Sequence, residues 1–196
     1  MNISLRRFSG MLLVCLTTLI MTSCSSEQQV KPNDFTLHAA SGPVSLSDYR
    51  NQVVLLFFGY THCPDVCPVT MNNVAIALRQ LEARESDRIK VLFVTVDPLR
   101  DSAEHLAKYL EFFHPNIVGL TGSAQEIKKA ASMYDVEFFI EDKKTDVAYE
   151  VVHSSFLFLL NGDGKTSDIM SHHTKPEDIA IALRKWLNAL PSASAK

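Results

Sequence analysis

The chain has 196 residues, enough for one domain with a sizeable core, and this length does not require a second domain. Apolar residues make up 46% and charged residues 21%, a globular composition that argues against disorder. The formal net charge of -3 provides no basic field for nucleic acid, so we expect no nucleic-acid partner.

Residues 1–23 are typical of an export signal. Two arginines precede an apolar run that is too short for a comfortable membrane span, and small residues follow it before Cys24. The stretch IMTSCSS resembles a bacterial lipobox, with Met21 where leucine is usual. This resemblance implies a lipoprotein signal, cleavage before Cys24 and lipid attached to that cysteine. An uncleaved anchor or a plain signal peptide is the alternative, and each of them exports the domain.

Residues 24–33 are polar and predict a tether before the fold. The folded domain is expected over residues 34–190, and residues 191–196 form a short flexible tail.

Two continuous apolar runs, Val53–Tyr60 and Lys90–Asp97, predict strands that are buried on both faces. Between them the apolar spacing of Val74, Leu78 and Leu81 predicts an amphipathic helix. A strand–helix–strand crossover of this kind pairs its strands in parallel.

The second half of the chain predicts three more helices and two hairpins. Residues 136–153 and 154–173 each contain two short strands around a turn. Start signals for the helices are the pairs Asp101 and Glu104, Ser123 and Glu126, and Thr174 and Glu177. The whole pattern indicates an α/β, thioredoxin-like three-layer sandwich. Its central mixed sheet is flanked by helices, and an extra β-hairpin precedes His153.

The stretch FGYTHCPDVCP holds Cys63 and Cys67, the two cysteines that would remain after loss of Cys15 and lipidation of Cys24. Such a pair permits a small structural disulfide, a redox couple or a metal clamp. A disulfide across so short a loop adds little entropic stabilisation, which makes the purely structural role weak.

The prolines of this stretch predict how the loop meets the helix. Because proline is favoured at the first helical position, Pro68 is predicted to begin the helix with Cys67 at its cap. The positive end of a helix lowers thiol pKa values, so both sulfurs are expected to be thiolates. Two soft sulfurs with an imidazole suit copper, Cu(I) in particular.

Three motifs, FFGYTHCPDVCP, VTVDPLRD and VVHSSFLFLLNGDGK, resemble in order and spacing those of the Sco/SenC family. These are thioredoxin-fold copper proteins that assemble the copper centre of cytochrome c oxidase subunit II. The resemblance runs from about Asp34 to Leu190. It implies one copper ion per chain, Cu(I) or Cu(II), with Asp97 as a helper near the site. The implied ligands are Cys63, Cys67 and His153.

His153 stands just before a predicted apolar strand, at a place where ordinary thioredoxins and peroxiredoxins carry a proline. His62 adjoins Cys63 and is expected to point away from the metal. His172 and His173 are interpreted as exposed edge residues, and His105 has no partner at a recognisable spacing.

Three functions compete. The favoured one is a copper metallochaperone, rather than an enzyme, that serves cytochrome c oxidase. The alternative is a membrane-anchored thiol-disulfide oxidoreductase in which Cys63 and Cys67 form a redox disulfide, although C-x-x-C and the usual proline are absent. A peroxidase of the peroxiredoxin kind ranks last, and a zinc site would lack a fourth ligand.

The expected partners follow from the resemblance. They are oxidase subunit II or a related copper protein, and in addition another copper chaperone or a thioredoxin-like reductase. The expected location is the bacterial cell envelope, with the domain on the periplasmic side of the membrane that holds the lipid anchor.

Overall fold

The computed structural model describes residues 33–141, 145 and 149–191, which belong to one compact unit. The predicted export signal, nearly all of the tether and most of the C-terminal tail lie outside the described residues. Within the described part of the chain, no helix is long and apolar enough to cross a membrane.

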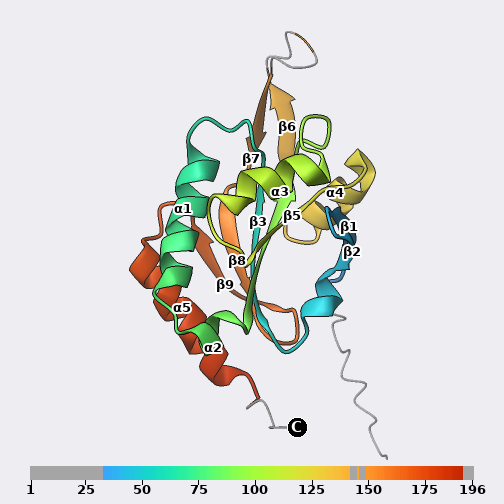
Figure 1. Ribbon diagram of the computed structural model, residues 1–196. Helices are drawn as coiled ribbons and strands as arrows, with labels where there is room; N and C mark the ends of the chain where they lie inside the picture. The colour runs from blue at the N-terminus through green and yellow to red at the C-terminus, as the bar shows by residue number, and fades with distance from the viewer. Residues whose placement is uncertain (1–32, 142–144, 146–148, 192–196) are drawn as a thin grey trace, which may run out of the picture. The chain divides into compact units, whose positions relative to one another are not determined.

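A five-stranded mixed sheet forms the centre of the unit, in the order β5-β4-β3-β8-β9 (Figure 1). The β3–β4 and β4–β5 pairs are parallel, whereas β8 is antiparallel to both β3 and β9. This arrangement confirms the predicted crossover and the late hairpin. The strands are β3 (Val53–Gly59), β4 (Ile89–Thr95), β5 (Ile117–Leu120), β8 (Phe156–Leu160) and β9 (Thr166–Ser171).

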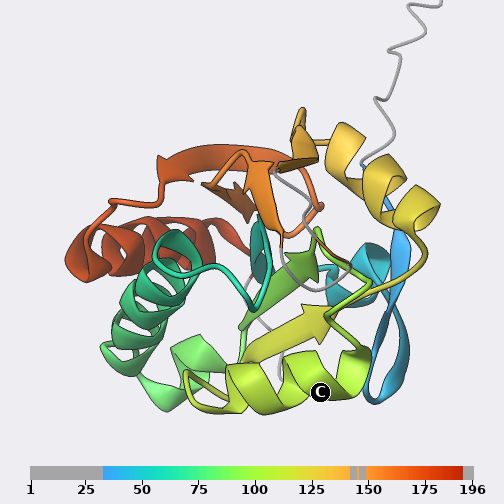
Figure 2. The same ribbon diagram turned by 90° about the horizontal axis from the view of Figure 1, so that it is seen from above.

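The two faces of the sheet carry different layers because successive side chains of a strand point to opposite sides. Phe57 contacts Phe93, which contacts Tyr109 of α3, on the face where α1 also lies. Phe58 contacts Tyr134, beyond the end of α4, on the other face. Figure 2 shows α1 and α5 on one side and α4 with the β1–β2 hairpin on the other. The sandwich is therefore three-layered, as predicted.

The remaining bounds complete the fold. Helices on the first face are α1 (Val66–Arg79), α3 (Ala103–Glu111) and α5 (Pro176–Ala189). The second face carries α4 (Ala124–Ser132), β1 (Thr36–Ala39) and β2 (Gly42–Ser45), and the short helices are η1 (Leu46–Tyr49) and α2 (Ala83–Ser86). Strands β1, β2 and β5, each four residues long, were not predicted.

The predicted capping residues of α3 and α5 were wrong. Helix α3 is capped by the hydroxyl of Ser102, which accepts from the His105 amide, because Asp101 turns inward instead. Helix α5 has Lys175 at its cap and Pro176 as its first residue, so Thr174 plays no part in capping. The Ser123–Glu126 capping box of α4 is confirmed.

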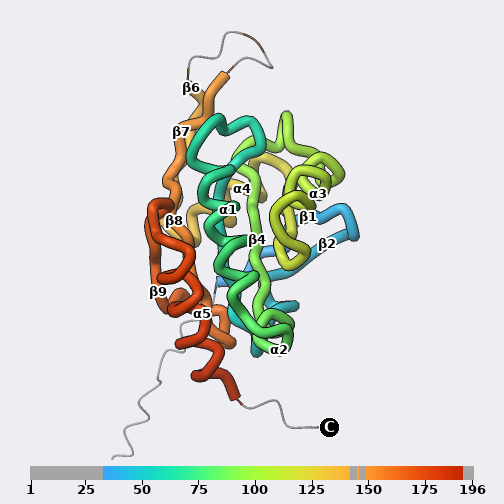
Figure 3. The backbone as a smooth tube through the Cα atoms, turned by 60° about the vertical axis from the view of Figure 1, so that its left-hand side comes forward, coloured from blue at the N-terminus to red at the C-terminus, as the bar shows by residue number. Residues whose placement is uncertain are grey.

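A second, two-stranded sheet is made by β6 (Phe138–Glu141) and β7 (Glu150–His153). It is the predicted extra hairpin, and His153 is the last residue of its second strand. Figures 1 and 3 both place this hairpin at the end of the central sheet where α1 begins. The topology thus brings His153 to the same end of the domain as the cysteine loop.

Candidate metal centre

The cysteine pair lies where β3 gives way to α1. Cys67 is the second residue of α1 and is fully buried, whereas Cys63 lies in the preceding loop and is partly exposed. The Cys67 amide donates to Cys63 Sγ over 3.5 Å. The loop therefore folds back so that the first turn of the helix presents its backbone to the first sulfur.

The start of α1 differs from the prediction by two residues. The helix begins at Val66, so Pro68 is its third residue rather than its first. The helix tolerates Pro68 at this position because the helical hydrogen bonds begin one residue later. The Val69 amide is the first to donate, to the Asp65 carbonyl over 3.3 Å. Amides in the first turn have no partner within the helix, and a missing N–H there costs nothing.

His153 faces the buried sulfur. Its Nε2 lies 3.7 Å from Cys67 Sγ, while its Nδ1 lies 3.0 Å from the Ser154 carbonyl oxygen. A carbonyl only accepts, so Nδ1 carries the ring proton and Nε2 of the neutral imidazole presents its lone pair to the cysteines. This is the arrangement typical of metal-binding histidines, in which the other nitrogen donates to a backbone carbonyl.

Two aromatic rings hold that imidazole in place. Phe57 and Tyr60 both meet it edge-on, with ring centroids 6.3 Å and 5.8 Å away. Both of these aromatic side chains are buried. The orientation of His153 is therefore built into the core rather than left to a mobile loop.

The pKa values of the two thiols are shifted in opposite directions. The pKa of Cys63 is lowered to about 3, chiefly because the Cys67 thiol donates a hydrogen bond to its sulfur, with further support from backbone amides. The pKa of Cys67 is raised, first because its proton is engaged by Cys63 and then because it is buried. The raised pKa of Cys67 departs from the expectation of two thiolates and favours one thiolate, at Cys63, beside a protonated Cys67.

Gly59, which the sequence did not single out, gives the buried sulfur its space. A Cβ built on this last residue of β3 would lie 3.0 Å from Cys67 Sγ, 2.6 Å from Phe57 Cε1 and 3.1 Å from Phe93 Cε2. Such contacts are closer than packed atoms allow. The sulfur can occupy its place only because this residue has no side chain.

Asp97 acts on the site through the hairpin. Its carboxylate pairs with Arg100 and accepts a hydrogen bond of 2.5 Å from the Tyr149 hydroxyl. Arg100 also donates to the Tyr149 carbonyl over 3.1 Å and lies over the Tyr149 ring. Because Tyr149 immediately precedes β7, this buried network fixes the strand that ends at His153. The structure thus gives the predicted helper a positioning role.

A second polar cluster was missed. Asp101, the last residue of the VTVDPLRD motif, is fully buried and lies near the side chains of His62 and His105. The sequence offered no spacing that links the three, since His62 follows β3 while Asp101 and His105 follow β4. His172, by contrast, contacts Ser155 and its neighbour His173, and it belongs to neither cluster.

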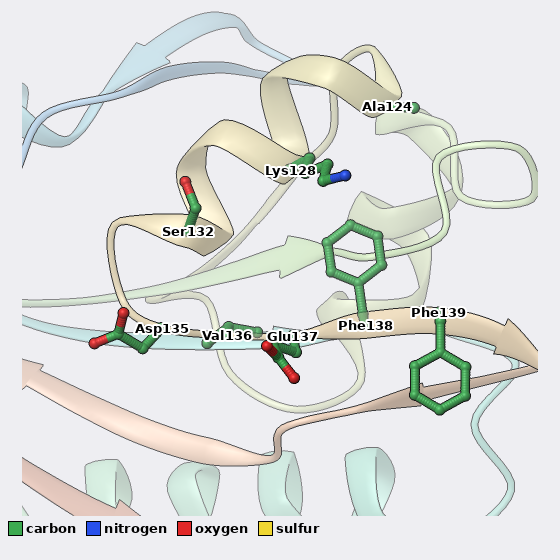
Figure 4. Close-up of a pocket in the computed structure, with 8 residues that line it drawn as sticks. All are labelled: Ala124, Lys128, Ser132, Asp135, Val136, Glu137, Phe138 and Phe139. Carbon is green, nitrogen blue, oxygen red and sulfur yellow. The ribbon is translucent and has the colours of Figure 1, made fainter.

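A hollow of about 660 Å³ lies beside α4 and holds none of the predicted ligands. Figure 4 shows its lining, with Phe138 of β6 pointing toward Lys128 and Phe139 pointing to the opposite side of the strand. The strand register pairs Phe138 with His153 on β7. The other lining residues are Ala124, Ser132, Asp135, Val136 and Glu137.

Taken together, these features define a thioredoxin-like protein whose cysteine loop and hairpin bring two sulfurs and one imidazole nitrogen together. The model of the SCO1/SenC family matches residues 24–188, and the chain belongs to this family.

Relatives and solved structures agree with this assignment. The mitochondrial SCO2 homolog of Bos taurus is 38% identical over 173 residues, which are 87% of this chain and 65% of that protein. The chain thus spans somewhat less than two thirds of that relative's length. Apo Sco1 from Thermus thermophilus is 36% identical with a TM-score of 0.73, covering 79% of this chain and 91% of that one. Copper-bound ScoI from Bradyrhizobium japonicum is 31% identical with a TM-score of 0.73, covering 80% and 99%.

Proposed function

We propose that this protein is a copper metallochaperone that binds one copper ion through Cys63, Cys67 and His153. The ion is its cargo, destined for the copper centre of cytochrome c oxidase subunit II or a related copper protein. The observation that carries the proposal is the approach of His153 Nε2 to Cys67 Sγ at 3.7 Å, with Nδ1 held by a carbonyl. The copper-bound ScoI structure, of similar fold, supports the choice of metal.

The donor set fits Cu(I). Two thiolates and a neutral imidazole are soft or borderline ligands, and a three-coordinate site suits this ion better than a hard cation. The partly exposed Cys63 gives a metal or a partner access to the site, while the buried Cys67 and the packed His153 keep its shape. Because Cys67 is protonated in the metal-free state, uptake of Cu(I) at neutral pH releases about one proton per ion.

We place the domain on the periplasmic face of a bacterial membrane, held by lipid on Cys24 after removal of residues 1–23. Residues 24–33 would then serve as the tether. The lipobox-like sequence before Cys24 supports this arrangement. Mass spectrometry of the mature N-terminus tests it, since an unmodified Cys24 removes the lipid anchor.

A second function is favoured by the unequal thiols. Cys63 is the thiolate, hence the nucleophile, and Cys67 holds the proton. Attack of Cys63 on a partner disulfide forms a mixed disulfide and expels one partner sulfur as thiolate. Cys67 then loses its proton and attacks the Cys63 sulfur, which releases the second partner sulfur. Two electrons pass from the Cys63–Cys67 pair, which becomes a disulfide, to the partner, which becomes a dithiol. This reaction would prepare the cysteines of the oxidase copper site.

Copper binding by the reduced full chain, in competition with a Cu(I) chelator, tests the favoured function. We expect one copper ion per chain. Loss of a residue that only supports a ligand lowers metal affinity by about 10- to 100-fold, and His153→Ala should lower the affinity for Cu(I) by more than that. His114→Ala is the matched control, because that histidine accepts a hydrogen bond from the Asn116 amide, before β5, and its loss should leave the affinity unchanged. Copper retention unaffected by His153→Ala contradicts the three-ligand site.

Two further measurements separate delivery from reduction. Turnover of a partner disulfide by the metal-free protein, at a rate that survives His153→Ala, favours the reductase. Loss of cytochrome oxidase activity in a deletion strain, restored by added copper, favours delivery.

A further inference from the structure

The polar cluster of His62, Asp101 and His105 brings together three groups that commonly bind metals. One ligand atom from each residue lies within 4.8 Å of the others. His62 comes from the loop after β3 and His105 from the first turn of α3, while Asp101 lies between β4 and α3. The ends of two parallel strands therefore meet at this point, as they do at many ligand sites of α/β sheets.

Thr61 marks the space between the three side chains. Its hydroxyl donates to Asp101 Oδ1 over 2.5 Å and lies 3.1 Å from His62 Nδ1 and 3.0 Å from His105 Nε2. The two imidazole rings stack with centroids 5.9 Å apart. Two histidine nitrogens and one carboxylate oxygen thus converge on a single point that one small polar group occupies.

The carboxylate carries the strongest argument for a cation. Asp101 has no exposed surface, and the donors that its hydrogen bonds use are neutral: the Thr61 amide and hydroxyl, and the Thr95 hydroxyl. The nearest cationic group that the described contacts give it is His62, at 3.8 Å and only when protonated. A buried carboxylate is stabilised by a full positive charge, and a metal ion provides one.

The rings can rearrange around an ion at small cost. Both histidines are exposed, so each can move its proton from the nitrogen that faces Thr61 to the one that faces water, and then present a lone pair to the centre. Ligand atoms about 2.0–2.2 Å from a metal lie roughly 3–3.6 Å from one another, so the three atoms need to close by about 1 Å.

We propose that His62, Asp101 and His105 form a second metal site, distinct from the cysteines and selective for a borderline divalent cation. Imidazole and carboxylate ligands suit Cu²⁺ and Zn²⁺, and the general order of affinities places Cu²⁺ ahead. The soft sulfur site and this harder site therefore favour different oxidation states of copper. The proposal does not depend on copper binding at Cys63 and Cys67.

The test uses the full chain with all four cysteines replaced by serine and His153 by alanine, so that the sulfur site is absent. CuCl₂ is titrated by calorimetry, and the bound ion is examined by electron paramagnetic resonance. We expect one Cu²⁺ per chain, with couplings from two imidazole nitrogens, and weaker binding of ZnCl₂. Circular dichroism of each variant establishes that it is folded.

Single substitutions in that background decide the outcome. His105→Ala and His62→Ala should each lower the affinity for Cu²⁺. The loss should exceed the about 10- to 100-fold effect of removing a residue that only supports a ligand. The paired variant His172→Ala, His173→Ala is the matched control and should bind as before. Cu²⁺ binding that survives His105→Ala, or is lost in the control, overturns the site. Absence of binding in the background protein shows that the cluster is only a polar network.

Discussion

Replacing Gly59 by alanine should disturb the metal centre without removing a ligand. The new Cβ would lie 3.0 Å from Cys67 Sγ. Packed carbon atoms are separated by about 3.5–4.0 Å and sulfur is larger, so the sulfur must move by about 0.5–1 Å. Metal sites lose function when a ligand is displaced by about this much. We expect Gly59→Ala to lower the affinity for Cu(I) by about 10- to 100-fold, which is the effect of losing a residue that supports a metal ligand.

Gly119→Ala provides the matched control. A Cβ on this β5 glycine would lie 2.6 Å from Leu106 Cβ and 2.8 Å from Leu110 Cδ1, both on α3. Each variant should lose about 1–3 kcal/mol of unfolding free energy through overpacking. Only the variant at Gly59 should lose copper affinity, as measured by chelator competition beside urea denaturation. Equal copper affinities in the two variants would refute the argument that the space at Gly59 sets the sulfur position.

Three further predictions concern the thiols, the hairpin and a helix cap. Because the pKa of Cys63 is lowered to about 3 while that of Cys67 is raised, iodoacetamide should label only Cys63 in the reduced, metal-free protein. The rate of Cys63 labelling should stay nearly constant from about pH 5 to about pH 7, whereas an ordinary thiol reacts about tenfold faster with each pH unit in this range. Labelling of Cys67 before Cys63 would contradict this assignment. Tyr149→Phe removes the hydroxyl that donates to Asp97, and should lower the unfolding free energy by about 1–3 kcal/mol in urea, since a buried carboxylate oxygen loses its donor. An unchanged midpoint would mean that water replaces the bond. Ser123→Ala should lower the unfolding free energy in urea by about 1 kcal/mol, because the Ser123 hydroxyl caps α4. An effect near zero would show that the Glu126 half of the capping box suffices.

Continuous apolar runs determined the core strands β3 and β4, because strands buried on both faces need no polar alternation. The three motifs determined the family, and thereby the proposed ligand set. Strand β5 escaped prediction, since its four residues depend on the neighbouring β4 for their hydrogen bonds. Helix starts were displaced by a residue or two where a side chain had a better partner in the fold, as Asp101 does in Thr61 and Thr95.

The sequence by itself determined which residue types are available: a close pair of cysteines, a distant histidine and a helix that begins beside them. Only the tertiary structure decided how they meet. The hairpin brings His153 Nε2 to 3.7 Å from Cys67 Sγ. The hydrogen bond between the two thiols, together with burial, raises the pKa of Cys67, while the pKa of Cys63 is lowered. Likewise, the convergence of His62, Asp101 and His105 arises from strands that lie side by side. Contacts of this kind depend on the three-dimensional path of the backbone, which no local spacing of residues records.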